Sequence, residues 1–316
     1  MSSASAPNDG SIDCGLVSVI MPAWNAADTI AQSIRSALNQ SYSNLCVMVV
    51  DDCSTDGTVE IVKALCKEDD RVQLIGLEAN QGAAMARNRG ILERPTDSRW
   101  LAFLDSDDIW HPDKLHLQLA HASSTDAGLL YSSYWRMSSD MSLSGRPVRV
   151  PPEISYQQLL SNTAIAASTV VLDLQKVPKV QLVNGMYEDF ELWTRLLSFG
   201  VVATGVQEPL MCYRLRSDSV SSNSVRMSRH TWGIIRSQPG MSLLRACSCY
   251  VRYAARAFVK HVKYAPKFPM DKRSDFGPDS FLEKVSQPNI RHREGGVDPV
   301  ASAKDPKKMM MSGTNG

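Results

Sequence analysis

The sequence has no long hydrophobic run and no paired cysteines. No stretch of the 316 residues approaches the ~20 apolar residues that a membrane-spanning helix needs. Residues 1–15 carry no basic residue ahead of an apolar run, so they lack the pattern of a secretory signal. The seven cysteines are odd in number and include no C-x-x-C pair, which argues against a disulfide framework and against a zinc knuckle. These absences favour a cytoplasmic protein in a reducing compartment.

Charge and composition limit the partners and divide the chain. The net charge is only +1, so no global field attracts the chain to nucleic acid. A hydrophobic content of 43% is enough for a large buried core. We expect a disordered tail over residues 1–15, a globular domain over 16–225, a basic amphipathic helical extension over 226–264, and a disordered tail over 265–316.

Short apolar runs alternate with helical patterns between residues 16 and 104. The runs at 17–21, 45–50, 72–77 and 100–104 have the composition of buried strands. Apolar residues at helical spacing separate them, at 30–38, 59–65 and 82–92. Such alternation predicts an α/β fold with a Rossmann-like, mostly parallel central sheet flanked by helices. In an open sheet of this kind, ligands bind beyond the carboxyl ends of the strands.

Three carboxylates within four residues follow the last of these strands. In Asp105-Ser106-Asp107-Asp108 the charges repel one another, so holding them together costs stability unless a cation is present. Hard oxygen ligands of this kind suit Mg²⁺ or Mn²⁺, which can bridge to the oxygens of a nucleotide diphosphate. Aspartates ahead of Pro112 are also common as caps of a following helix. The position at a strand end favours the metal site, although the motif alone is compatible with either role.

The sequence DDCSTDG at 51–57 follows the second strand and resembles the start of a calcium-binding loop. The twelfth loop position would be Lys63, where a bidentate Glu is required, so that interpretation fails. We instead expect its two leading aspartates to point into a cleft, while Ser54 or Asp56 caps the next helix. A carboxylate in that position can accept a hydrogen bond from the imide of a uracil or from a ribose hydroxyl.

The sequence NQGAAMARNRG at 80–90 opens a helix with a glycine and small residues. These allow a ligand to approach the backbone closely. Arg87 and Arg89 are two residues apart and therefore face different directions on a helix, so that one can reach the cleft while the other is solvated. The pattern does not decide which of the two does so.

The sequence YEDFELWTRL at 187–196 begins with two acids, Glu188 and Asp189, and continues with apolar residues at helical spacing. It follows a run near 169–172 that we interpret as a further strand. Acidic residues in the first turn of a helix commonly do no more than complement the helix dipole. By itself, this segment does not indicate a catalytic site.

Together, however, these segments resemble the family 2 glycosyltransferases. The matching segments, in the order and spacing of that family, are VSVIMPAWN at 17–25, VVDDCSTDG at 49–57, NQG at 80–82, FLDSDD at 103–108 and EDFELW at 188–193. Each is common alone, but five in register are specific, and the resemblance covers residues 16 to about 222. It implies a GT-A fold, a nucleotide-sugar donor, a divalent cation (Mn²⁺ or Mg²⁺) and inversion at the anomeric carbon.

The resemblance also implies roles for individual residues. Asp52 would contact the base of the donor, and Asp189 would be the catalytic general base. Asp105 and Asp107 would form the D-x-D pair that holds the metal, with Asp107 as the preferred direct ligand. The donor-binding residues that we expect are Pro22, Asn25, Asp52, Asn80, Arg87, Asp105, Ser106 and Asp107.

The implied function is transfer of a sugar from a UDP-sugar to a hydroxyl of a saccharide or lipid-linked acceptor. The segment YRLRSDS at 213–219 resembles relatives that build surface polysaccharides, and the Q-x-x-R-W motif of processive synthases is absent. A non-processive enzyme of cell-surface polysaccharide or glycolipid biosynthesis follows. A nucleotidyltransferase is an alternative, but it normally carries a glycine-rich phosphate loop where this chain has PAWN at 22–25. An inactive nucleotide-sugar-binding protein, the other alternative, would have lost a metal or base carboxylate, and none is lost.

The segment 243–263 has the pattern of a basic amphipathic helix. Five cations share one narrow stripe at 100° per residue: Arg245, Arg252, Arg256, Lys260 and Lys263. Such a helix can lie on an anionic membrane, which suits an acceptor carried on a lipid and would place the protein peripherally on the inner face of the plasma membrane. A helix docked on its own core is an equal alternative.

Overall fold

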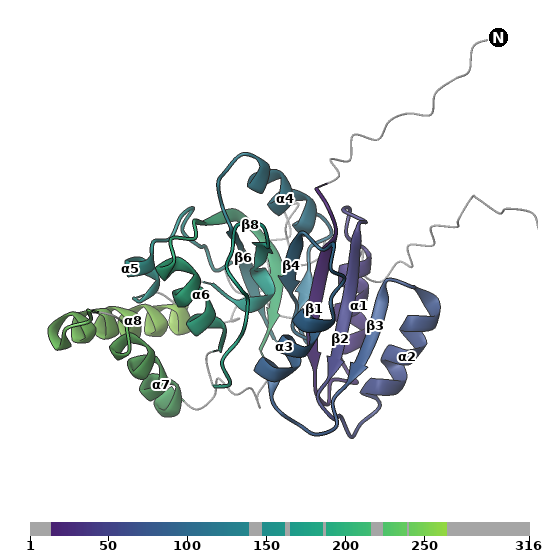
Figure 1. Cartoon of the computed structure of the whole chain (residues 1–316). Helices are drawn as coiled ribbons and strands as arrows, with labels where there is room; N and C mark the ends of the chain where they lie inside the picture. Colours follow the sequence, from purple (N-terminus) through teal and green to yellow (C-terminus); the bar gives the residue numbers. More distant parts are fainter. Residues whose placement is uncertain are drawn as a thin grey trace, which may run out of the picture.

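The computed structural model describes residues 14–138, 147–161, 165–185, 188–215, 224–238 and 240–263. The two tails that we expect to be disordered lie outside these residues, apart from residues 14 and 15. Figure 1 shows a central sheet covered by helices, with the helices α7 and α8 side by side at one end of the molecule. None of the described helices is long and apolar enough to cross a bilayer.

In chain order the elements are β1 (Val17–Ala23), α1 (Ile30–Leu38), β2 (Leu45–Asp51), α2 (Thr58–Glu68), β3 (Val72–Gly76), α3 (Ala83–Glu93), β4 (Trp100–Phe103), β5 (Ile109–Trp110), α4 (Lys114–Ser123), β6 (Leu129–Met137), α5 (Tyr156–Leu159), the 3₁₀-helix η1 (Ala167–Thr169), β7 (Val171–Asp173), α6 (Glu188–Ser198), β8 (Ala203–Arg214), α7 (Ser224–Arg236) and α8 (Leu243–Lys263). The first four strands lie where the sequence predicts them. The strand expected near 169–172 begins later, because residues 167–169 form η1.

The strands form one mixed sheet in the order β3-β2-β1-β4-β7-β6-β8-β5. β1 pairs in parallel with both β2 and β4, and β2 pairs in parallel with β3. β7 runs antiparallel to β4 and β6, and β5 runs antiparallel to β8. The predicted α/β fold with a mostly parallel sheet is confirmed, and the reversed strands belong to the half of the sheet that the sequence pattern left undefined.

Two apolar clusters cover the two faces of the sheet. Every residue of β1 is buried, and alternate side chains of β1 point to opposite faces. Val17, Val19 and Met21 pack with residues of α1, α2 and α4 on one face, while Ile20 packs with residues of α3 and α6 on the other. Burial on both faces explains why the parallel strands are continuous apolar runs.

Helix α3 lies unusually close to the sheet because Gly90 faces it. A Cβ atom at Gly90 would lie 2.8 Å from Ile20 Cγ2 and 3.0 Å from Val50 Cγ2. The close approach brings the start of α3 to the carboxyl ends of β1 and β2. Any larger residue at this position would push α3, and the residues it carries, away from that edge of the sheet.

Helices α7 and α8 form a pair that docks on α5. Ile235 and Ala246 are fully buried and pack with Leu160 at the end of α5. Arg256 of α8 reaches back to the body, where its Nη1 donates to the carbonyl of Ser161 at 2.9 Å. One face of α8 is therefore docked on the body of the protein, as one of the two alternatives for this helix predicts.

Candidate active site

The carboxyl ends of β1, β2 and β4 meet at one edge of the sheet, because β1 pairs in parallel with both neighbours. Asn25, Asp52 and Asp105 lie just beyond these three ends. Each comes from a different segment singled out in the sequence, and the topology brings the three segments together. A ligand in this position is expected for an open α/β sheet.

Asp52 is buried and anchors the loop that leads into α3. Its Oδ1 accepts from the backbone N–H of Gln81 at 2.7 Å, and its Oδ2 accepts from that of Gly82 at 2.8 Å. Gly82 has a φ of 88°, which residues with a side chain rarely adopt, so glycine is needed there. Asn80 Nδ2 donates to the carbonyl of Asp52 at 3.2 Å. The expected base-binding residue and Asn80 thus form one hydrogen-bonded unit.

Asn25 connects the loop after β1 to the loop after β2. Its backbone N–H donates to Ser54 Oγ at 2.9 Å, and its Oδ1 accepts from the N–H of Thr55 at 2.8 Å. Ser54 is therefore used by this connection, whereas Asp56, one residue before the N-cap Gly57, accepts from the first N–H of α2 at 3.0 Å. Pro22 is buried within β1, one residue before the end of the strand, and its expected contact with the donor stays a prediction.

The turn 105–108 is held by groups from two distant elements. The carbonyl of its second residue accepts from Ser33 Oγ of α1 at 2.9 Å. The carbonyl of Asp107 accepts from Arg214 Nε of β8 at 3.0 Å. Asp108 is buried, its Oδ1 accepts from the N–H of Arg214, and burial followed by the nearby Asp107 raises its pKa well above the ordinary value. Asp108 therefore belongs to the support of the turn.

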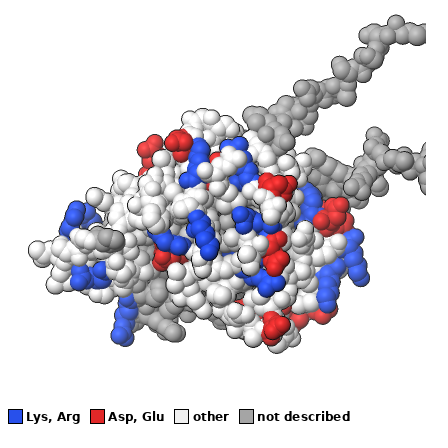
Figure 2. Space-filling model, viewed as in Figure 1, with Lys and Arg blue, Asp and Glu red and all other residues white. Residues whose placement is uncertain are grey.

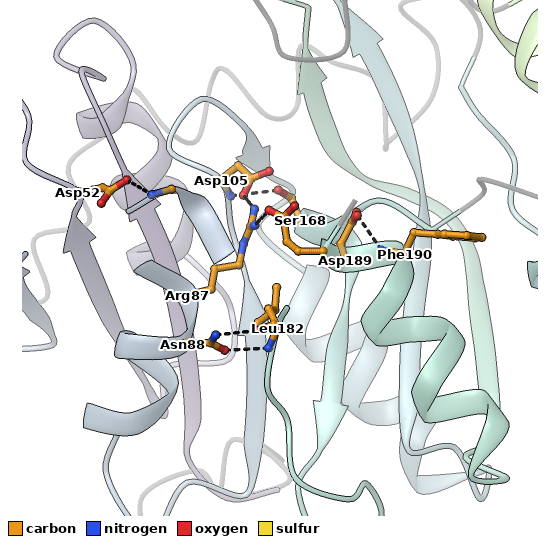
Figure 3. Close-up of polar contacts among 10 residues, drawn as sticks. Asp52, Arg87, Asn88, Asp105, Ser168, Leu182, Asp189 and Phe190 are labelled. Atoms are coloured by element: carbon orange, nitrogen blue, oxygen red, sulfur yellow. Dashed lines mark hydrogen bonds and ion pairs between the residues drawn. The ribbon is translucent and has the colours of Figure 1, made fainter. Parts of the chain in front are cut away.

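Arg87 is buried between two carboxylates. Its Nη2 lies 2.5 Å from Asp105 Oδ1 and its Nη1 lies 2.7 Å from Glu188 Oε1, and Figure 3 shows Arg87 reaching up to Asp105. Burial lowers the pKa of Arg87, but Asp105 and Glu188 outweigh this and raise it, so the guanidinium stays charged. Arg89 points away and pairs with the exposed Glu93. Of the two arginines, Arg87 is therefore the one that turns toward the acids of the site, and its expected contact with the donor stays a prediction.

Asp189 lies beside this ion pair at the start of α6. Its Oδ1 accepts from the N–H of Phe190 at 2.7 Å (Figure 3). Loss of solvation, and next the negative charge of Glu188, raise the pKa of Asp189 to about 6, against the opposing effect of Arg87. Glu188 is paired with Arg87, whereas Asp189 has a pKa suited to a base that works near neutral pH.

The turn 105–108 fits a divalent cation that is shared with a ligand. Among the residues that the structure describes, no three His, Cys, Asp or Glu side chains gather into a complete metal site. Mg²⁺ does not need one, because it is commonly bound by one or two carboxylates together with substrate phosphates and water. Asp105 and Asp107 supply two carboxylates on one turn, and the Asp105 side chain is 31% exposed despite its pairing with Arg87.

Several contacts of the site have no signal in the sequence. Glu188 lies 101 positions from its partner Arg87, and Arg214 lies 107 positions from Asp107. Asn88 of α3 exchanges two hydrogen bonds of 2.8 Å with the backbone of Leu182, which ties α3 to the segment before α6 (Figure 3). Spacing within one segment cannot reveal such partners, because they depend on how the second half of the sheet closes on the first.

Comparison with known proteins identifies the family of this arrangement. Residues 18–168 match the family model described as glycosyl transferase family 2. TuaG of Bacillus subtilis, assigned as a teichuronic acid biosynthesis glycosyltransferase, is 38% identical over 248 residues, which cover 78% of this chain and 98% of TuaG. WfaP of Escherichia coli, a UDP-Glc:α-D-GlcNAc-diphosphoundecaprenol β-1,3-glucosyltransferase, is 33% identical over 78% of this chain and 95% of its own.

Solved structures share the fold at low sequence identity. The structure of Staphylococcus aureus TarS in complex with UDP-GlcNAc matches 77% of this chain and 72% of its own, with a TM-score of 0.56 and 19% identity. The mannosyltransferase PcManGT of Pyrobaculum calidifontis, in complex with GDP-Man and Mn²⁺, matches 80% of this chain and 76% of its own, with a TM-score of 0.56 and 16% identity. Both structures share the overall fold of this chain, which supports the GT-A fold expected from the sequence.

Proposed function

The chain belongs to glycosyl transferase family 2 and is a glycosyltransferase, and we propose that it moves one sugar from a UDP-sugar to a hydroxyl of a lipid-linked saccharide, with inversion at the anomeric carbon. One observation carries the proposal. The buried guanidinium of Arg87 connects the D-x-D turn to helix α6, which begins with Glu188 and the proposed base Asp189. The groups for the leaving diphosphate and for the attacking hydroxyl are therefore held in one fixed relation.

The chemistry follows from these positions. Asp189 accepts the proton of the acceptor hydroxyl as that hydroxyl attacks the anomeric carbon. Asp105 and Asp107 would hold a divalent cation, which when bound neutralises the charge that develops on the leaving diphosphate. With one base and one leaving-group site, a single in-line displacement is sufficient, and this inverts the anomeric carbon.

A uridine nucleotide is the donor that we favour. WfaP is named for UDP-Glc and TarS is bound to UDP-GlcNAc, while PcManGT is bound to GDP-Man. In this chain, Asp52 and Asn25 border the edge where the base would lie, and outer lone pairs of the Asp52 carboxylate can accept from the imide of uracil.

A donor screen tests this proposal directly. We would measure thermal stabilisation and donor hydrolysis with UDP-Glc, UDP-Gal, UDP-GlcNAc and GDP-Man, each with Mn²⁺ and with excess chelator. The expected result is stabilisation by at least one UDP-sugar, hydrolysis that requires the cation, and little response to GDP-Man. Full activity in excess chelator would remove the metal from the mechanism, and a preference for GDP-Man would contradict the uridine donor.

The acceptor that we propose is a saccharide on a lipid diphosphate, in the synthesis of a surface polysaccharide or glycolipid. WfaP is named for a diphosphoundecaprenol acceptor and TuaG for teichuronic acid biosynthesis. Labelled sugar from the donor should enter an organic-extractable product when GlcNAc-diphosphoundecaprenol is supplied. Equal transfer to a free, water-soluble GlcNAc would contradict a lipid-linked acceptor.

We also propose that α7 and α8 contact an anionic membrane, on the inner face of the plasma membrane. Residues 224–263 contain eight Lys or Arg and no Asp or Glu, in a chain whose net charge is only +1. Figure 2 shows Lys and Arg side chains at the end of the molecule where these helices lie. Opposite its docked face, α8 exposes Leu244 (84%) and Val251 (65%). Basic and apolar surfaces side by side suit an anionic bilayer.

A further inference from the structure

Ser168 makes two hydrogen bonds here, one to the turn 105–108 and one to Trp110 just beyond it. It lies in η1, in the part of the chain where the sequence shows little pattern, and it is 1% exposed. Its Oγ accepts from the backbone N–H of Asp105 at 3.0 Å. Its carbonyl accepts from Trp110 Nε1 at 2.7 Å. Figure 3 shows Ser168 directly beside Asp105.

The hydroxyl of Ser168 is suited to this position because its oxygen can accept from a backbone N–H. It accepts from the N–H that opens the turn, while the carbonyl of the same residue accepts from Trp110 just beyond the turn. The backbone at Asp105 is therefore held by an atom of a different element, η1. Without the hydroxyl, the N–H of Asp105 would lose its partner, and the start of the turn could shift and move the carboxylates that it carries.

We propose that Ser168 is a positioning residue, whose hydroxyl fixes the geometry in which Asp105 and Asp107 present their carboxylates to a divalent cation and the donor diphosphate. This inference rests on the proposed function, because the cation at this turn is part of that proposal. Ser168 acts through the turn and does not itself contact the reacting atoms.

The neighbouring Thr169 offers a matched control. It is fully buried in the same helix, but its hydroxyl donates only to the local carbonyl of Ala166, at 2.7 Å. Thr169→Val removes a buried hydroxyl of η1 at nearly constant volume. Ser168→Ala removes the one that reaches the turn. A general loss of packing or folding would affect both variants, whereas a positioning role would affect only the second.

The test is the affinity of the full chain for Mn²⁺ in the presence of UDP, measured by calorimetry or by electron paramagnetic resonance, beside its affinity for UDP in chelator. Ser168→Ala should raise the Kd for Mn²⁺ roughly tenfold, as expected when an N–H of the metal-binding turn loses its hydrogen-bond partner. Its Kd for UDP in chelator should stay within about twofold. Thr169→Val should change neither. If Ser168→Ala does not fold, Ser168→Cys, whose thiol is a weak donor and acceptor of similar size, must show the raised Kd instead.

The outcomes distinguish a failure of the positioning role of Ser168 from a failure of the proposed function. An unchanged Mn²⁺ affinity in the Ser168 variant, or an equal loss in Thr169→Val, would overturn the positioning role and leave the proposed function intact. Wild-type protein that transfers sugar without binding Mn²⁺ or Mg²⁺ would instead overturn the metal assignment, and the role of Ser168 with it.

Discussion

At the scale of single residues, Arg87 determines how the acids of the site share their charge. Asp105 approaches its guanidinium from the end of β4 and Glu188 from the start of α6, at 2.5 and 2.7 Å. A planar guanidinium can satisfy two carboxylates in different directions, whereas the single ammonium of a lysine cannot span both. The donor contact expected for Arg87 stays a prediction, but its contacts within the protein already give it a role in the site.

Arg87→Lys should therefore be a severe change despite keeping the charge. We expect kcat/KM to fall at least tenfold and the free energy of unfolding to fall by about 3 kcal/mol, at the low end for a buried pair because Asp105 is partly exposed. Arg89→Lys, on the exposed side of the same helix, should change both by little. Kinetics and denaturant unfolding of the two variants check this. Similar effects of both substitutions would remove Arg87 from its bridging role.

Substitution of Asp189 distinguishes a catalytic enzyme from a protein that only binds the nucleotide-sugar. Asp189→Asn keeps the size of the side chain but removes the proton acceptor, so kcat should fall by about 10²–10⁴-fold. Donor affinity should barely change, because the donor contacts proposed at the ends of β1, β2 and β4 do not include Asp189. Glu188→Gln should be milder in kcat, since Glu188 is not the proton acceptor. Turnover and donor affinity of both variants give the answer, and near wild-type turnover in Asp189→Asn would exclude it as the base.

The raised pKa of Asp189 also predicts a pH dependence. The ionised carboxylate is the active form, so kcat should be constant above about pH 7 and fall as the pH drops through the pKa of about 6. The fall from pH 7 to pH 5 should be roughly tenfold, because about a tenth of such a group is ionised one pH unit below its pKa. The check is the acid limb of kcat at saturating donor and acceptor. A limb near pH 4 would mean that the carboxylate keeps its ordinary pKa.

At the scale of elements, the sequence predicts β1 to β4, locates β7 only approximately, and misses β5, β6 and β8. β1 and β2 are buried along their whole length and appear as uninterrupted apolar runs. β6 and β8 bury polar residues, Ser132, Ser133 and Thr204, which interrupt the pattern that marks a strand. β7 has only three residues, too few to show a period, and the strand expected near 169–172 overlaps only its first two. Its position is set by pairing with β4 and β6, which no local pattern encodes.

Helix α8 has two apolar faces with different partners, and the outer one is the proposed membrane contact. Leu244→Glu combined with Val251→Glu should abolish binding to anionic vesicles, because it places charge where apolar side chains would enter the bilayer. Donor hydrolysis in solution should be unchanged. Leu92→Glu, at a residue that is 76% exposed on α3, is the matched control and should bind as the wild type does. Vesicle co-sedimentation at low and high salt measures all three proteins.

The point variants are preferable to removing the helix. Ala246 and Ile235 close over Leu160, so a truncated chain would expose an apolar surface of the body. Vesicle binding that survives the double substitution would contradict the outer face as the contact. Binding lost equally in Leu92→Glu would show only that added negative charge is repelled by the vesicle.

At the scale of the whole molecule, the near-zero net charge conceals two oppositely charged regions. The edge of the sheet carries the aspartates of two segments, 51–56 and 105–108, whereas the charged side chains of the α7–α8 pair are all Lys or Arg. The sequence predicts this edge correctly, because parallel strand order alone brings Asn25, Asp52 and Asp105 together. It could not predict that Glu188 reaches Arg87, since that contact depends on the packing of α6 against α3.

Ligands that bind this acidic edge should stabilise the whole fold. With UDP and Mn²⁺ at about 100 times their Kd, the native state should gain ~2.7 kcal/mol, which raises the Tm by about 5–10 °C for a domain of this size. Mn²⁺ alone should contribute little, because the turn supplies only two carboxylates and the diphosphate must complete the site. Asp107→Ala should lose the part of the shift that depends on Mn²⁺ and keep the part given by UDP in chelator. Asp70→Ala, at an exposed aspartate beyond α2, should keep both parts. Thermal melts of the three proteins with each ligand combination measure this, and a Mn²⁺-dependent shift that persists in Asp107→Ala would place the cation elsewhere.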